Sequence, residues 1–142
     1  MQKIKDLSKE RKISILILLN SVLIIIFASI HAKNISNSDA YEKFLTSYSN
    51  VNYSTYISKI REFKNTLIAY GLVLFVYTIY NINKEKFSLV YKILNCYICF
   101  SLQTMTWLSF IPHTVYSNII LSLLVILFIL FIIRTGKKAK KK

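Results

Sequence analysis

Two cysteines three positions apart, Cys96 and Cys99, have the type and spacing of residues that do redox or metal chemistry. A C-x-x-C pair can cycle between two thiols and a disulfide, and it can supply two of the four ligands of a zinc ion. A disulfide needs β-carbons about 3.8 Å apart, which is closer than positions i and i+3 of a continuous helix normally come. The chemistry of the pair therefore depends on whether the surrounding residues form an unbroken helix.

A zinc site or a Cys–His dyad would also need a histidine beside the cysteines, and the chain has only His31 and His113. If residues 87–110 form a helix, His113 lies about 21 Å along its axis from Cys99, at ~1.5 Å per residue. His31 ends a different apolar segment, so we interpret both histidines as polar residues at the ends of helices. We accordingly expect no metal, no cofactor and no catalytic residue, and hence no enzyme.

The cysteines belong to the third of four apolar segments, which cover residues 13–30, 66–82, 87–110 and 117–133. Each segment approaches or exceeds the ~18 apolar residues that a bilayer crossing requires. Two glycines and one proline in 142 residues favour long helices over strands. A soluble chain of this size could not bury four such helices. The sequence therefore predicts an all-α, polytopic membrane protein, a single membrane domain over residues 1–142 with four transmembrane helices.

Four apolar segments with a C-x-x-C are similar to the membrane thiol reductases of the vitamin K epoxide reductase type in that spacing alone. This chain has no second cysteine pair to relay electrons, because it contains two cysteines in all. A membrane thiol oxidoreductase is therefore a less favoured alternative.

Lysine and arginine are concentrated before residue 13, at Lys84 and Lys86, and in the tail 134–142. With four crossings these three stretches share one side, and the positive-inside rule places that side and both termini in the cytoplasm. The expected location is the cell membrane, or the endoplasmic reticulum in a eukaryote. The connections around Asn83 and Pro112 are short, which predicts that the second, third and fourth helices are antiparallel neighbours.

Cleavage of segment 13–30 as a signal peptide is the alternative at the N-terminus, but the apolar run is too long for one. The net charge of +13 raises the further alternative of a nucleic-acid binder. The basic residues flank apolar segments and are not interleaved with exposed aromatic residues, so we expect no nucleic-acid partner. Instead, the N-terminal lysines and the basic cytoplasmic tail should contact anionic lipid headgroups on the cytoplasmic side.

Residues 31–65 are predicted to form a helical loop on the outer side of the membrane, because their apolar positions recur at helical spacing. Ser38 or Asp39 can cap its first helix, residues 49–52 are the expected break, and its second helix should continue into segment 66–82. A disordered loop is the alternative. The candidate contact surface on this loop consists of Tyr41, Tyr48, Tyr53 and Tyr56.

One face of the third segment is polar. At 100° per residue, an arc of about 100° contains Lys92, Asn95, Cys96, Cys99, Gln103 and Thr106, together with Ser88. We expect this face to point into the bundle, where Asn20 and Ser21 of the first segment are candidate partners. Lys92 lies near the start of the helix, so its stem can extend to the cytoplasmic boundary.

These patterns favour a small non-enzymatic membrane protein that acts through helix–helix or outer-loop contacts with another membrane or secreted protein. An accessory subunit and a protein that gives immunity to a toxin both fit. The alternative is a pore or transporter subunit that uses the polar face, although the four segments lack the aspartate or glutamate that usually couples protons. A holin-like protein is a less favoured interpretation.

Overall fold

The computed structural model describes residues 9–82, 88–108 and 111–133. These residues form five helices and no strand: α1 (Lys9–Ile35), α2 (Ser38–Leu45), α3 (Tyr53–Asn81), α4 (Leu89–Leu108) and α5 (Val115–Ile132). The prediction of an all-α chain is confirmed. The helices α1, α3 and α5 are long and apolar enough to cross a membrane.

The third predicted crossing, 87–110, corresponds to α4, a helix of 20 residues. Its most apolar 18-residue stretch has a lower hydropathy than those of α1, α3 and α5, and by this measure α4 is not among the helices apolar enough to cross a membrane. Its polar residues Lys92, Asn95 and Gln103 reduce its mean hydropathy. Four crossings therefore remain a prediction. The basic stretches at 84–86 and 134–142 lie outside the described residues.

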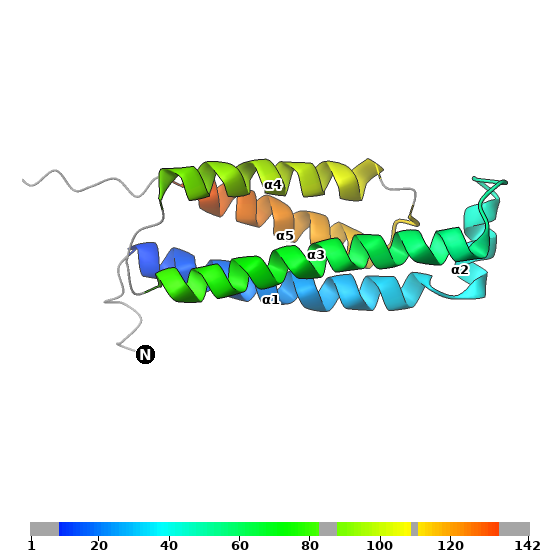
Figure 1. Ribbon diagram of the computed structural model, residues 1–142, viewed down its shortest axis with the longest axis horizontal. Coiled ribbons are helices and arrows are strands. Elements are labelled where there is room, and N and C mark those ends of the chain that lie inside the picture. Colours follow the sequence, from blue (N-terminus) through cyan, green and yellow to red (C-terminus); the bar gives the residue numbers. More distant parts are fainter. Residues whose placement is uncertain (1–8, 83–87, 109–110, 134–142) are drawn as a thin grey trace, which may run out of the picture.

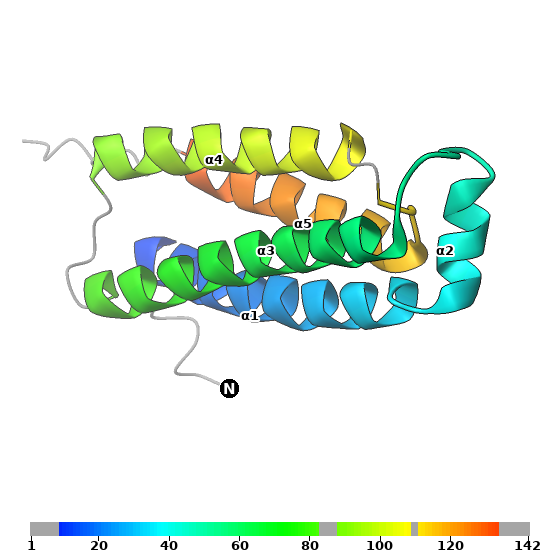
Figure 2. The ribbon, with the colours of Figure 1, turned by 45° about the vertical axis from the view of Figure 1, so that its right-hand side comes forward.

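Four long helices run side by side, and α2 lies across one end of them, which we call the cap end (Figures 1 and 2). The closely packed helix pairs are α1 with α3, α1 with α5, and α4 with α5. Their order around the bundle is therefore α3, α1, α5, α4. Both α5 and α3 are neighbours of α4, as predicted, but α3 meets α4 through side chains and not through close backbone packing.

Gly71 explains why α3 packs on α1. A β-carbon at Gly71 would lie 2.7 Å from Cγ1 of Ile25 and 3.1 Å from the carbonyl oxygen of Ser21, so a larger residue would force Ile25 to move and would crowd the backbone of α1. On the side of α3 that faces α4, by contrast, large tyrosine side chains keep the two backbones apart. The short connection between α3 and α4 thus does not decide which helices pack closely.

The loop predicted for residues 31–65 is helical, and its second helix continues into the next apolar segment as the single helix α3. The helical structure is interrupted between Leu45 and Tyr53, and this interruption includes the predicted residues 49–52. Asn37, and not Ser38 or Asp39, caps α2, because its side-chain oxygen accepts a hydrogen bond from the backbone N–H of Ala40 at 2.7 Å. Asn52 caps α3 in the same way.

The sides of the bundle are apolar and its interior holds many of the polar residues. Buried polar side chains occur on all four long helices: Ser14, Asn20, Ser21, His31, Thr78, Asn81, Asn95, Thr106 and Ser117. The exposed side of α4 carries Leu89, Val90, Ile93, Leu94, Tyr97, Phe100, Trp107 and Leu108. An exposed apolar surface of this extent is unusual for a bundle surrounded by water.

Candidate functional site

A hydrogen-bonded polar centre lies between α3 and α4. The hydroxyl of Tyr70 donates to Oδ1 of Asn95 at 3.2 Å, and its oxygen lies 3.1 Å from Sγ of Cys99. A tyrosine hydroxyl has one proton, so the thiol of Cys99 is the donor in the second contact. The amide nitrogen of Asn95 donates to the carbonyl oxygen of Tyr91 at 2.9 Å. The hydroxyl of Tyr70, the amide of Asn95 and the thiol of Cys99 therefore all have hydrogen-bond partners although they are buried.

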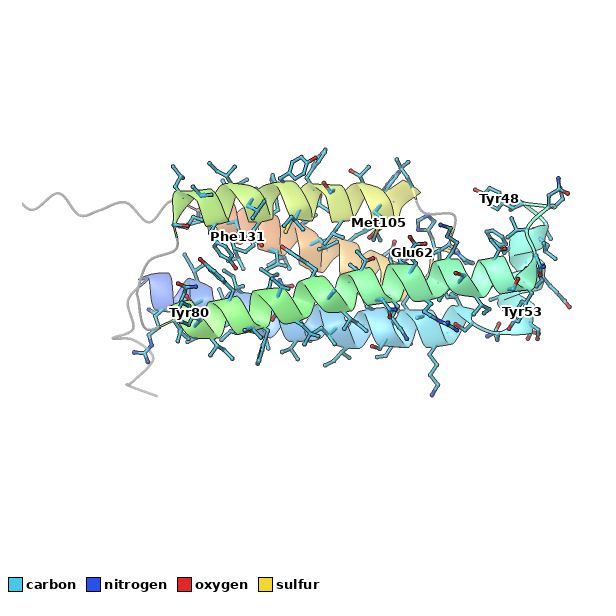
Figure 3. The ribbon with its side chains drawn as sticks, viewed as in Figure 1. Tyr48, Tyr53, Glu62, Tyr80, Met105 and Phe131 are labelled. Carbon is cyan, nitrogen blue, oxygen red and sulfur yellow. The ribbon has the colours of Figure 1, made fainter. Side chains whose placement is uncertain are left out.

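Aromatic rings fill the space between α3 and α4 on one side of this centre. The rings of Tyr77 and Tyr91 stack with centroids 4.1 Å apart and planes 20° apart. Tyr91 also meets Phe131 of α5 edge to face, with centroids 5.8 Å apart (Phe131 is labelled in Figure 3). Tyrosine side chains thus join α3 to α4 where their backbones do not pack closely.

The polar face predicted on α4 is divided between the interior and the surface. Asn95, Cys99 and Thr106 are buried, whereas Lys92, Cys96 and Gln103 are half-buried and Ser88 is exposed. The Oγ of Thr106 donates to the carbonyl oxygen of Leu102 at 2.8 Å. Of the buried residues, Asn95 and Cys99 form the hydrogen-bonded contact with α3.

The partners predicted for this face, Asn20 and Ser21, do not contact it through hydrogen bonds. Ser21 donates to the carbonyl oxygen of Leu18 within its own helix, and Oδ1 of Asn20 is buried without a hydrogen-bond partner among the described residues. The actual partner is Tyr70 of α3. Phe63, Tyr70 and Tyr77 recur every seven residues on one face of α3. That repeat is the signal that would have identified it.

The two cysteines are not joined by a disulfide in this structure. Both thiols are free, and α4 is a continuous helix through Cys96 and Cys99. Within residues 9–82, 88–108 and 111–133, no three histidine, cysteine, aspartate or glutamate residues come together as metal ligands. Cys99 instead serves as a small hydrogen-bonding side chain under Tyr70.

No protein-family model, curated protein or solved structure matches the chain. The function is therefore inferred from the residues and contacts of the chain itself.

A second polar cluster ties α1 to α5 at the cap end. Nδ1 of His31 lies 2.9 Å from Oγ1 of Thr114, and that Oγ1 accepts hydrogen bonds from the backbone N–H groups of Tyr116 and Ser117. Because both lone pairs of Oγ1 are occupied, its proton is directed to Nδ1, and His31 is a neutral acceptor there. The ring of Phe63 on α3 meets His31 edge to face at 5.8 Å. The cluster thus connects three helices.

His31 was interpreted as a polar residue at the end of a helix, and its burial corrects that interpretation. Its side chain is buried, whereas His113 is exposed. The extension of α1 by five residues past the predicted end at Ile30 places His31 inside the bundle, where α3 and α5 cover it. The contacts of His31 thus hold α1, α3 and α5 together at the cap end.

The four tyrosines predicted as a contact surface have two different roles. Tyr56 is buried and donates to the carbonyl oxygen of Ile35 at 2.7 Å, and the half-buried Tyr41 donates to that of Val51 at 2.6 Å. The ring of Tyr56 also meets the rings of Tyr41 and Phe44, with centroids 5.3 and 5.0 Å apart, and these contacts hold α2 on the bundle. Tyr48 and Tyr53 are 42% and 43% exposed, and they lie at the cap end (Figure 3).

A pocket of about 590 Å³ opens beside Tyr48, between α2 and the residues that precede α5. Asp39, Lys43 and Ser47 line it from the α2 side, and Pro112 and His113 line it from the other side. Of the two exposed tyrosines, Tyr48 thus borders a pocket that contains groups of both charges and a hydroxyl. Of the sites described, this one is the most accessible to a partner.

The burial of Cys99 can be measured by its reactivity. Cys99 is 0% exposed and covered by Tyr70, so we expect a charged, water-soluble thiol reagent to modify the Cys96→Ser variant at least tenfold more slowly after folding than after denaturation. Mass spectrometry of the intact protein gives the modified fraction over time. The Cys99→Ser variant, which keeps the half-buried Cys96, is the matched control. Rapid modification of Cys99 in the folded protein would instead favour a water-filled path along α4.

Proposed function

We propose that this chain is a small, non-enzymatic, multi-pass membrane protein that acts by binding another protein at its cap end. The observation that carries the proposal is the pairing of an apolar bundle with a folded polar cap. The sides of the bundle expose aliphatic and aromatic residues. At the cap end, Tyr48, which follows α2, borders a pocket lined by Asp39, Lys43 and His113, and Tyr53 is exposed at the start of α3. Such a chain is suited to display a rigid contact surface at a membrane.

In this proposal all four long helices cross the membrane. Since α4 packs against α5 and runs beside it, a bilayer that surrounds α5 would also surround α4 (Figure 1). The apolar exposed side of α4 supports this placement, because lipid would meet Val90, Ile93 and Tyr97 while the polar Asn95 and Cys99 stay inside. The helix is long enough, since 20 residues span about 30 Å.

The proposed orientation follows the basic residues. Both termini face the cytoplasm of a cell-membrane protein, and the cap faces outward. The proposed partner is therefore a secreted protein or the outer part of another membrane protein, as for an accessory subunit or a protein that protects against a toxin. Tyrosine suits such contact because it combines a large ring with a polar tip.

Site-specific photo-crosslinking tests this function. A photoreactive phenylalanine analogue is placed at Tyr48 or at Tyr53 in the cell that makes the protein, with Tyr97 on the side of α4 and Tyr80 at the opposite end of the bundle as controls (Figure 3). We expect one discrete heavier adduct from the cap positions and none of that mass from the controls. Adducts that form only at Tyr97 or Tyr80 would contradict a contact surface at the cap.

A further inference from the structure

Three basic side chains line a single groove between α1 and α3. Lys33 comes from the last turn of α1, and Arg61 and Lys64 come from the first half of α3. The groove has a volume of about 280 Å³ and is also lined by Ser29, Ala32, Ser36, Ile57 and Ile60. It therefore brings together positive charges from two helices that are far apart in the sequence.

Nothing in the described parts of the chain neutralises this charge. Among the described residues one ion pair is present, between Lys59 and Glu62 at 3.0 Å, and it includes none of the three basic groove residues. The hydroxyls of Ser29 and Ser36 donate their protons to the carbonyl oxygens of Ile25 and Ala32 in α1, and neither carries a negative charge that could balance the groove. Like charges held around one groove repel each other, and a bound anion would relieve this repulsion.

We propose that this groove binds the phosphate group of an anionic phospholipid. An arginine can bind two phosphate oxygens in parallel, while each lysine contributes a compact positive charge. This inference rests on the membrane placement proposed above but not on the cap as a contact surface. It adds an anionic-lipid site at the cap end, on the opposite side of the membrane from the basic tail.

The surroundings of the groove favour a lipid over a free anion. Its wall contains Ala32, Ile57 and Ile60, and the exposed surface of α1 and α3 away from the cap is apolar at Ile26, Ile30 and Leu72. A lipid whose phosphate lies among the three cations has this surface for its acyl chains. A free phosphate ion would gain only the electrostatic part of the interaction.

Native mass spectrometry of the full-length protein in detergent tests the proposal. The protein is titrated with phosphatidylglycerol, phosphatidylcholine or inorganic phosphate, and the dissociation constant of the first bound molecule is measured. The Lys33→Gln/Arg61→Gln/Lys64→Gln variant is compared with Lys43→Gln/Lys59→Gln, which removes basic residues at the same end of the bundle from outside the groove. Circular dichroism establishes that both variants keep their helix content.

We expect phosphatidylglycerol to bind more tightly than phosphatidylcholine and the groove variant to lose at least tenfold in phosphatidylglycerol affinity, since each basic contact with an anionic headgroup contributes up to ~1 kcal/mol. The control variant should lose less than about twofold. Equal losses in the two variants would overturn the site, because they would indicate general attraction to positive charge. Inorganic phosphate that binds as tightly as the lipid would overturn the lipid as ligand. Neither result would affect crosslinking at the cap.

Discussion

Replacing Tyr70 with alanine is expected to lower the free energy of unfolding by about 3 kcal/mol or more, because it removes a buried ring and leaves a cavity between α3 and α4. Replacing it with phenylalanine removes only the hydroxyl that bonds Asn95 and Cys99, and it should cost about 0.6 to 1.7 kcal/mol, the range found for hydrogen bonds inside membrane bundles. The measurement is unfolding of the purified protein in mixed micelles with increasing denaturing detergent, followed by circular dichroism.

The matched control for Tyr70 is Tyr97→Ala on the exposed side of α4. Tyr97 is 71% exposed, and its replacement should change stability by less than about 0.5 kcal/mol. If Tyr70→Ala and Tyr97→Ala have equal effects, Tyr70 does not join α3 to α4. A Tyr70→Phe variant as unstable as Tyr70→Ala would mean that the hydrogen bonds of the hydroxyl, and not the packing of the ring, stabilise the contact between α3 and α4.

Replacing Thr114 with valine is expected to cost about 2 to 4 kcal/mol, the second largest effect. Valine keeps the shape of threonine but removes the oxygen that caps α5, a loss of up to ~2 kcal/mol. The same change leaves Nδ1 of the buried His31 without its partner, at a further ~1 to 3 kcal/mol. Thermal unfolding in detergent, followed by circular dichroism, measures the loss.

The control for this change is Thr114→Ser, which keeps the hydroxyl and should retain most of the stability. A double-mutant cycle with His31→Leu isolates the contact between the two side chains. If the valine change costs the same with histidine or leucine at position 31, the His31–Thr114 hydrogen bond contributes no stability and only the cap matters.

The sequence predicts the helices well because their signals are local. Apolar runs, the rarity of glycine and proline, and the periodic tyrosines of residues 31–65 depend on neighbouring positions only, and the five helices follow from them. The continuation of residues 53–65 into the second apolar segment is of the same kind. The cap residue of α2 was misplaced by one position, which is within the usual uncertainty of helix ends.

The packing of the helices was harder to predict, because it depends on residues far apart in the chain. The approach of α1 to α3 requires Gly71 to meet Ile25, and no periodicity within either helix shows that these two residues face each other. Likewise, the polar face of α4 was visible as a pattern, but its partner Tyr70 belongs to a helix whose tyrosines also suit a membrane boundary. Whether a tyrosine such as Tyr70 lies inside the bundle or at the membrane boundary depends on which helices pack around it, and that packing is not visible in the sequence.

The outer tyrosines show the same limit. Spacing alone grouped Tyr41, Tyr48, Tyr53 and Tyr56 as one surface, whereas their burial divides them into two that pack inside the cap and two that are exposed. The hydroxyl of Tyr56 reaches the carbonyl oxygen of Ile35 only because α1 ends beside the start of α3. Contact residues and structural residues of one type can therefore be separated only in three dimensions.

The four crossings with an outward cap are tested most directly by the accessibility of single cysteines at the two ends of α4. In a Cys96→Ser/Cys99→Ser background, Ser88→Cys and His113→Cys place a thiol at exposed positions before and after α4, and Ser47→Cys reports on the cap. A membrane-impermeant maleimide is applied to intact cells and to inverted vesicles. We predict labelling of positions 47 and 113 in intact cells and of position 88 only in inverted vesicles. Labelling of positions 88 and 113 from the same side would contradict the crossing of α4 and the topology built on it.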